Sequence, residues 1–190
     1  MTQQFRSDRK AMTLVELILA IILLNIIILT GLSMELGMRR IFSSTDIEAQ
    51  LLAEAVPIMT MVAKDINQAV GDIVNVPADD AYSYDPTIPP FDKYYIRKDV
   101  NGNGLADGGD PFAEYRYRAS TYTLDYRPSS TGGSYMILSD RATQFSVSAP
   151  VNGVSNISLT LRKNASLAAN YTNPQVTLNS SAQYRGYSYN

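Results

Sequence analysis

The 190-residue chain contains no cysteine, no histidine and no tryptophan. Without cysteine there are no disulfide bonds or thiol nucleophiles, and without histidine there is no imidazole-based catalytic triad or ordinary zinc ligand set. Carboxylates, lysine and tyrosine remain for acid–base chemistry, and no nucleophile motif accompanies them. We interpret Asp79, Asp80 and Asp92 as solvated loop acids rather than a catalytic pair, so we expect that the chain is not an enzyme.

Charge of one sign is also scarce. The chain has 16 basic and 18 acidic residues, a formal net charge of -2, and no run of basic residues along the sequence. Because nucleic-acid binding requires clustered cations to neutralise phosphates, we predict no nucleic-acid partner. The length fits one modest globular domain plus an additional segment.

The additional segment is an apolar run from Met12 to Met34. A helix crosses the hydrocarbon core of a bilayer with about 20 mainly apolar residues, so the run predicts a transmembrane span over residues 12–34. Basic residues on both sides of the run favour a cytoplasmic N-terminus only weakly. A cleavable secretory signal is the alternative, with the small residues of Gly31-Leu32-Ser33 as its cleavage site.

Glu16 places a carboxylate inside this apolar run. A charged side chain at the centre of a membrane-spanning helix costs roughly 2.5–3.5 kcal/mol on insertion scales, and somewhat less near the interface, so such residues usually have a partner and a function. The alternative is that Glu16 lies at the level of the lipid headgroups.

The residues around Glu16, Lys10-Ala11-Met12-Thr13-Leu14-Val15-Glu16, resemble the prepilin-peptidase signature of type IV pilins and type II secretion pseudopilins. The resemblance implies that a leader, residues 1–11, is removed between Ala11 and Met12, that Met12 is then N-methylated, and that Glu16 acts in assembly. The family usually has glycine before the cleaved bond and phenylalanine after it, where this chain has Ala11 and Met12.

Beyond the span, apolar residues recur every three or four positions from Ile47 to Val70, which predicts that the helix continues through residues 35–71. Pro57 is expected to kink or split it, and Gly71 to end it. Residues 72–91 have the composition of a loop. From Phe91 onward polar and apolar residues alternate in short runs, which is typical of antiparallel strands. Tyr115 and Tyr117 alternate with polar residues at 114, 116 and 118 (Glu114, Arg116 and Arg118), and after a tight hairpin at Ala119-Ser120, Tyr122, Leu124 and Tyr126 alternate with Thr123 and Asp125. Further short strands are expected around residues 136–138, 145–147, 157–161 and 176–178.

These patterns predict an α+β fold, in which a long N-terminal helix with a membrane-spanning first half packs on an antiparallel β-sheet, as in pilins. The expected organisation is a leader at 1–11, a transmembrane helix at 12–34, its periplasmic continuation at 35–71 and a β-rich globular domain at 72–190. Short runs such as Tyr115-Arg116-Tyr117 and Phe145-Ser146-Val147 resemble J-type minor pseudopilins and W-type minor pilins. That resemblance implies a place in a tip or initiating complex.

A loop between two expected strands, residues 99–110, carries oxygen-bearing groups at the spacing of a calcium-binding loop. The candidate ligands are the side chains of five residues and the carbonyl of a sixth, with Gly104 at the turn: Asp99, Asn101, Asn103, Leu105 (carbonyl), Asp107 and Asp110. The pattern resembles the loops of EF-hand and dockerin modules, although strands rather than helices flank it. The alternative is a polar Asn-Gly turn that binds nothing.

The sequence therefore predicts a structural subunit of a type IV pilus or a type II secretion pseudopilus that assembles through its N-terminal helix. Its expected partners are prepilin peptidase, other pilin or pseudopilin subunits and the bacterial inner membrane, with the globular domain in the periplasm and then in the filament or at the cell surface. Calcium is the expected cofactor. The alternative is a membrane-anchored, exported calcium-binding domain unrelated to filaments.

Overall fold

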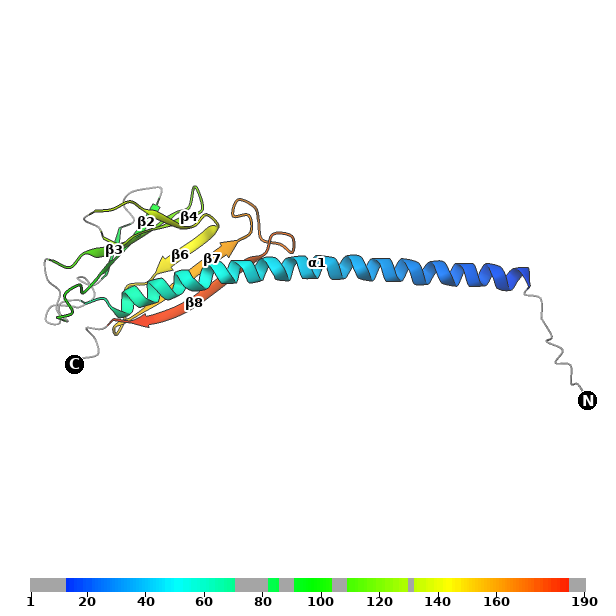
Figure 1. Cartoon of the computed structure of the whole chain (residues 1–190), viewed down its shortest axis with the longest axis horizontal. Helices are drawn as coiled ribbons and strands as arrows, with labels where there is room; N and C mark the ends of the chain where they lie inside the picture. Colours follow the sequence, from blue (N-terminus) through cyan, green and yellow to red (C-terminus); the bar gives the residue numbers. More distant parts are fainter. Residues whose placement is uncertain (1–12, 71–81, 86–90, 104–108, 130–131, 185–190) are drawn as a thin grey trace, which may run out of the picture. The chain divides into compact units, whose positions relative to one another are not determined.

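The computed structural model describes residues 13–70, 82–85, 91–103, 109–129 and 132–184. Its elements are one helix and eight strands (Figure 1): α1 (Leu14–Asn67), β1 (Tyr82–Asp85), β2 (Phe91–Arg97), β3 (Phe112–Arg118), β4 (Thr123–Arg127), β5 (Met136–Ser139), β6 (Ala142–Val147), β7 (Val154–Arg162) and β8 (Gln175–Gln183). In the described residues a long helix is followed by antiparallel strands, which confirms the predicted α+β class.

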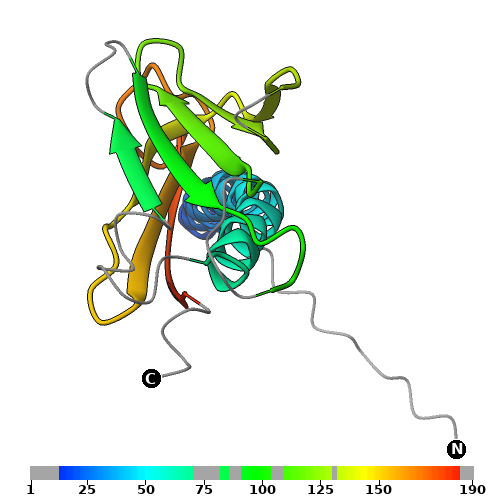
Figure 2. The ribbon, with the colours of Figure 1, turned by 90° about the vertical axis from the view of Figure 1, so that its left-hand side faces the viewer.

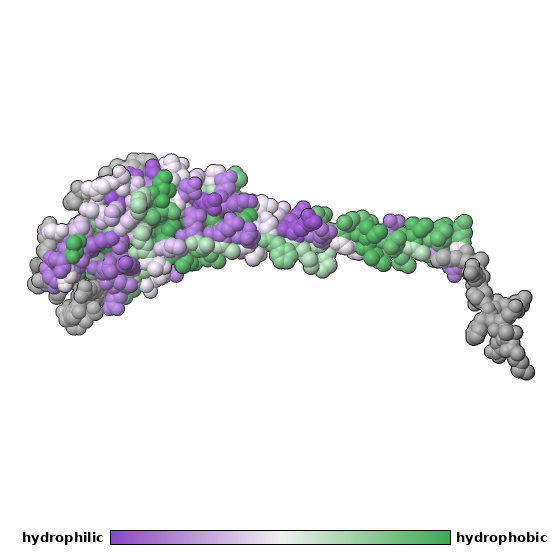
Figure 3. All heavy atoms as spheres, viewed as in Figure 1, coloured by the Kyte–Doolittle hydropathy of each residue, from purple (hydrophilic) through white to green (hydrophobic). Residues whose placement is uncertain are grey.

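The chain divides after Ser43 into two units, and α1 contributes to both. In the first unit the described residues form the apolar beginning of α1, and their leucines and isoleucines are about half exposed or more. In the space-filling view these residues form an extended green, apolar surface (Figure 3). This part of the helix has no protein core of its own to enter.

The second unit contains two antiparallel sheets where the sequence analysis predicted one. The larger sheet has the order β1-β2-β3-β4-β5 and the smaller sheet the order β6-β7-β8. The change of sheet falls at Asp140 and Arg141, and the strand pairings on both sides of it contain register irregularities. The alternation of polar and apolar residues is the same in both sheets, so the sequence pattern could not indicate which strands pair.

The core of the second unit is formed by residues of the two sheets and of the C-terminal part of α1. In the end-on view the strands lie beside this part of the helix (Figure 2). The helix contributes one face of apolar residues spaced three or four apart: Leu51, Ala55, Ile58, Met59, Val62 and Ile66. The sheets contribute alternate residues from their inner sides: Tyr94, Ile96, Tyr115, Tyr117, Leu124, Tyr126, Phe145, Ile157, Leu159 and Leu161. This helix-on-sheet packing is what the two periodicities predict.

Three local predictions need correction. Of the kink or split expected at Pro57, the split is wrong, because α1 runs unbroken to Asn67. Pro57 lies on the exposed side of the helix, where water can bind the carbonyl group left without a partner. The expected loop at 72–91 contains strand β1, an edge strand that pairs only with β2. Tyr122 belongs to a turn rather than a strand, with a left-handed φ of 57°. Gly71 lies outside the described residues.

Candidate functional sites

The N-terminus of α1 is closed by a reciprocal contact between Thr13 and Glu16. The backbone N–H of Thr13 donates to Glu16 Oε2 at 2.8 Å, and the Thr13 hydroxyl donates to the same oxygen at 3.0 Å. The backbone N–H of Glu16 donates in return to Thr13 Oγ1 at 3.3 Å. This is a capping box, in which the residue before the helix and the third helical residue satisfy each other's free N–H groups.

The capping box gives Glu16 a local partner, so its carboxylate is compatible with the start of an apolar helix. Both hydrogen bonds that the Glu16 carboxylate accepts within the described residues come from Thr13 and end on one oxygen, Oε2. The other oxygen has no such bond among the described residues and can accept from a group outside them. The expected processing residues, Ala11 and Met12, lie outside the described residues, so cleavage there stays a prediction.

Polar side chains inside the apolar part of α1 also bind their own backbone. The Thr30 hydroxyl lies 2.9 Å from the carbonyl oxygens of both Ile26 and Ile27, and the Ser33 hydroxyl donates to the carbonyl of Leu29 at 2.5 Å. Such bonds satisfy hydroxyl groups where no water is present. Within the described part of the chain, α1 is the one helix long and apolar enough to cross a membrane, which makes it a candidate membrane anchor.

The expected calcium loop is described only at its two ends. Asp99 Oδ1 accepts from the N–H of Gly102 at 2.6 Å, and Asn101 Oδ1 accepts from the N–H of Asn103 at 2.9 Å. Asp110 is nearly buried, and its Oδ1 accepts from the N–H of Val100 at 3.2 Å, which ties the loop ends together.

Two of the six expected calcium ligands, Leu105 and Asp107, lie outside the described residues. Among the residues that are described, no three acidic side chains come together in a group that could hold a metal ion. Because the described residues include only four of the six expected ligands, they do not test the predicted site, and calcium binding stays a prediction.

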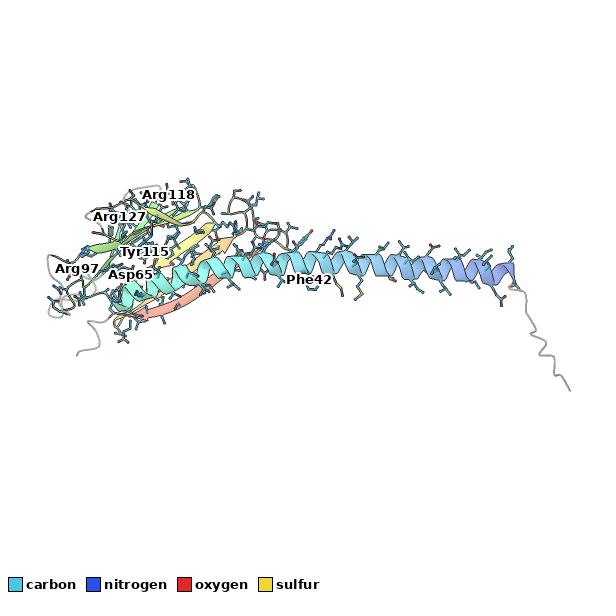
Figure 4. All side chains as sticks on the ribbon, viewed as in Figure 1. Phe42, Asp65, Arg97, Tyr115, Arg118 and Arg127 are labelled. Carbon is cyan, nitrogen blue, oxygen red and sulfur yellow. The ribbon has the colours of Figure 1, made fainter. Side chains whose placement is uncertain are left out.

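A buried ionic cluster joins α1 to the larger sheet. Asp65 is 4% exposed; its Oδ1 lies 2.9 Å from Lys98 Nζ, and its Oδ2 accepts from the Tyr115 hydroxyl at 2.6 Å. Lys98 Nζ also donates to the Tyr126 hydroxyl at 2.8 Å. Burial alone would lower the pKa of Lys98, but the hydrogen bonds to Tyr126 and Asp65 outweigh it and raise the pKa above its usual value. Figure 4 labels Asp65 and Tyr115.

The side of the larger sheet opposite the core carries a second ionic cluster. We call this side of the sheet the outer face. Its charged residues alternate along β2, β3 and β4 with the core residues, and one more lies on β1: Asp85, Lys93, Arg97, Glu114, Arg116, Arg118, Asp125 and Arg127. Arg97, Arg118 and Arg127 are labelled in Figure 4. Tyr95, Phe112 and Tyr135 add aromatic rings to the same face.

Two carboxylates on the outer face are fully buried beneath cations. Glu114 binds Arg127, accepts from the Tyr135 hydroxyl and lies 3.4 Å from Lys93 Nζ. Asp125 lies 2.8 Å from Arg116 Nη2, and Arg118 shares it. Burial by itself would raise the pKa of Glu114, but its hydrogen bonds and the neighbouring cations lower the pKa.

This cluster was missed by the sequence analysis, which interpreted Glu114, Arg116 and Arg118 only as the polar positions of a strand. A signal was available in the sequence: acids and arginines occupy every second position on two consecutive strands, at 114, 116 and 118 and again at 125 and 127. In an antiparallel hairpin such positions lie on one face and pair across the strands. The burial of the acids depends on how the long arginine side chains fold over them, and no sequence pattern gives that.

Comparison with known proteins adds no relative. No family model matches the chain, and neither the curated proteins nor the solved structures searched contain a match. The architecture is nevertheless pilin-like, because a long helix with an apolar N-terminal part packs through its C-terminal part on antiparallel strands.

Proposed function

We propose that this protein is a structural subunit of a type IV pilus or a type II secretion pseudopilus, and not an enzyme. The observation that carries the proposal is the beginning of α1: an exposed apolar helix of membrane-spanning length whose first turn contains the carboxylate of Glu16. A carboxylate held there by its own helix, with one oxygen still able to accept, suits pairing with a positive N-terminal amine of another subunit.

The same proposal places the chain in the bacterial inner membrane before assembly, with the second unit in the periplasm. Prepilin peptidase would remove residues 1–11 and methylate Met12, and other pilin-like subunits would bind through the apolar part of α1. The resemblance to J-type and W-type minor subunits suggests a tip or initiating complex. An exported calcium-binding domain that keeps α1 as a simple anchor is the competing proposal.

The mature N-terminus tests these alternatives. In cells that contain a prepilin peptidase, we expect the protein to begin at Met12 and to carry one added methyl group, as measured by mass spectrometry of the intact chain. The Ala11→Gly variant should be processed at least as fast. A terminus at Met1 on the assembled protein, or a terminus within or just after residues 31–34, would contradict the proposal and favour an uncleaved anchor or a secretory signal respectively.

We also propose that the loop at residues 99–110 binds calcium. Metal binding to the folded state alone stabilises it by about 2.7 kcal/mol at a hundredfold excess over Kd, which raises the melting temperature. Calcium should therefore raise the melting temperature of the parent chain relative to a chelator, and Asp99→Ala and Asp107→Ala should abolish this rise. Asp140→Ala, which alters an exposed acid outside the loop, is the control. If calcium shifts all these variants equally, the loop is a plain polar turn.

A further inference from the structure

The outer face concentrates positive charge that the sequence leaves scattered. Five of the ten lysines and arginines described after Ser43 lie on it, in a chain whose formal net charge is -2. Glu114 and Asp125 are buried beneath these cations, and side-chain exposure is 22% for Arg127 and 30% for Arg118. The groups that the face presents to a partner are therefore guanidinium groups and aromatic rings more than carboxylates.

Apolar groups complete this face. Tyr95 and Phe112 meet edge to face, and the Arg97 guanidinium lies 4.9 Å from the centre of the Phe112 ring. Arg116 stacks 3.6 Å above the ring of Tyr135. Ile137, the register partner of Asp125 on β5, is 65% exposed. Arginine and aromatic side chains are the residue types enriched in the centres of protein interfaces.

The complementary surface lies on α1 in the same unit. Ala49, Leu52, Ala53 and Val56 follow the spacing i, i+3, i+4 and i+7, so they form one stripe, and all are exposed. Two exposed acids border this α1 stripe: Asp46 comes three residues before Ala49, and Glu48 comes four residues before Leu52. No lysine or arginine occurs between Ile41 and Ala63.

We propose that the outer face of one copy of this chain binds the α1 stripe of a second copy. The charges are complementary, because Asp46 and Glu48 flank the stripe and cations flank the aromatic rings of the outer face. The two alanines of the stripe allow the helix to approach the sheet closely. The contact would place a helix on the outer side of the larger sheet, as α1 already packs on its inner side. The small surplus of cations over carboxylates favours such a partner over a phosphate polymer, which needs a denser positive surface.

This contact joins two different surfaces, so it is heterologous and each bound copy still presents one free surface of each kind. Copies can therefore add in an open series. The inference rests on the proposed function, because it supplies a contact between successive subunits of a filament. It also requires at least two adjacent copies, so it favours a position along the filament over the tip or initiating complex that the resemblance implies.

Disulfide trapping tests the contact, since the natural chain has no cysteine. One full-length chain carries Ala49→Cys on the stripe and another carries Ile137→Cys on the outer face; both are mixed in a nonionic detergent and oxidised mildly. We expect disulfide dimers in the mixture and several-fold fewer from either chain alone. A chain with both substitutions should give a ladder of oligomers. In the matched control, Lys163→Cys replaces Ile137→Cys, because Lys163 is exposed but lies on neither surface.

Exchanging charges between the two surfaces tests whether the outer face of one copy meets the acids beside the α1 stripe of another. Arg97 is suited to this test because it forms no ion pair within the described part of the chain, so Arg97→Glu on the Ile137→Cys chain should lower the dimer yield about fivefold without exposing a buried carboxylate. Glu48→Arg on the Ala49→Cys chain should restore the yield. Absence of dimers, equal dimers with Lys163→Cys, or no effect of Arg97→Glu would overturn the proposal. Loss without rescue by Glu48→Arg would show that Arg97 does not meet the acids beside the α1 stripe and would overturn the proposed contact.

Incorporation into filaments, measured beside dimer formation, separates this inference from the proposed function. Glu16→Ala should lower incorporation and leave the dimer yield unchanged, because Glu16 lies on neither surface. If dimers fail to form while the parent chain is incorporated into filaments, the contact is wrong and the function stands. If dimers form as expected while the parent chain is never incorporated, the function is wrong and the contact between copies stands.

Discussion

Glu16→Ala is expected to enter filaments at least about tenfold less than the parent chain. A charge-assisted hydrogen bond contributes about 1.5–3 kcal/mol, and 1.4 kcal/mol corresponds to a factor of ten in an equilibrium. In an apolar environment the loss is expected at the upper end of this range, since the amine left unpaired on the neighbouring subunit finds no water. The measurement is the fraction of the chain recovered in sheared filaments relative to the membrane fraction.

Glu16→Gln is the matched control that separates charge from helix capping. Glutamine forms the same capping box with Thr13 but carries no charge. If Glu16 acts by pairing with an amine, Gln should fail nearly as severely as Ala; if it only caps α1, Gln should behave like the parent chain. Wild-type incorporation of Glu16→Ala would contradict the filament proposal altogether.

Neither substitution should alter the second unit. The hydrogen bonds of the Glu16 carboxylate go to Thr13, in the first unit, and the core of the second unit begins only near Leu51. The near-ultraviolet circular dichroism of the 13 tyrosines should therefore melt at the same temperature in both variants and in the parent chain. A shared loss of stability would indicate misfolding rather than failed assembly.

The helix was predictable because its signals are local. The apolar run to Met34 is long enough for a membrane helix, the spacing from Ile47 to Val70 has the helical period, and α1 from Leu14 to Asn67 covers most of both. Thr13 and Glu16 also stand at the spacing of a capping box, although the sequence analysis interpreted them only through a family resemblance. The expected split at Pro57 was wrong because the effect of a proline on a helix depends on which side of the helix faces water.

The positions of the individual strands could be predicted from the sequence, but the way the strands pair could not. The sequence pattern located β2, β3, β4, β5, β6, β7 and the middle of β8, but the order of strands depends on contacts between distant residues. β1 has only four residues and follows a proline-containing segment, so composition suggested a loop. The two ionic clusters form where separate strands, or a strand and α1, bring charges together, as Lys98 and Asp65 show.

Asp65→Ala is expected to lower the free energy of unfolding of the second unit by about 3 kcal/mol. The substitution leaves Lys98 facing a site that no longer holds a counter-charge, and breaking a buried ion pair from one side costs about 3–5 kcal/mol. We expect the low end, because the Lys98 side chain is 22% exposed and can be partly rehydrated. For a chain of this size the melting temperature should fall by roughly 6–12 °C.

Asp46→Ala is the matched control, since it makes the same substitution on an exposed turn of the same helix and should change stability by less than about 0.5 kcal/mol. Tyr115→Phe removes only the hydroxyl that donates to Asp65 and should cost about 1–2 kcal/mol. An Asp65→Ala variant as stable as Asp46→Ala would show that the cluster contributes nothing to folding.

The double variant Asp65→Ala with Lys98→Met tests why the single substitution is harmful. If the damage comes from an uncompensated cation, removing that cation should return part of the lost stability, so the double variant should be more stable than Asp65→Ala alone. If the damage comes instead from lost packing of α1 on the larger sheet, the second substitution should add to the first. Lys98 also donates to the Tyr126 hydroxyl, so any gain will be smaller than the whole loss. Unfolding curves of the four members of this cycle, recorded in one detergent at one pH, therefore measure the coupling between Asp65 and Lys98.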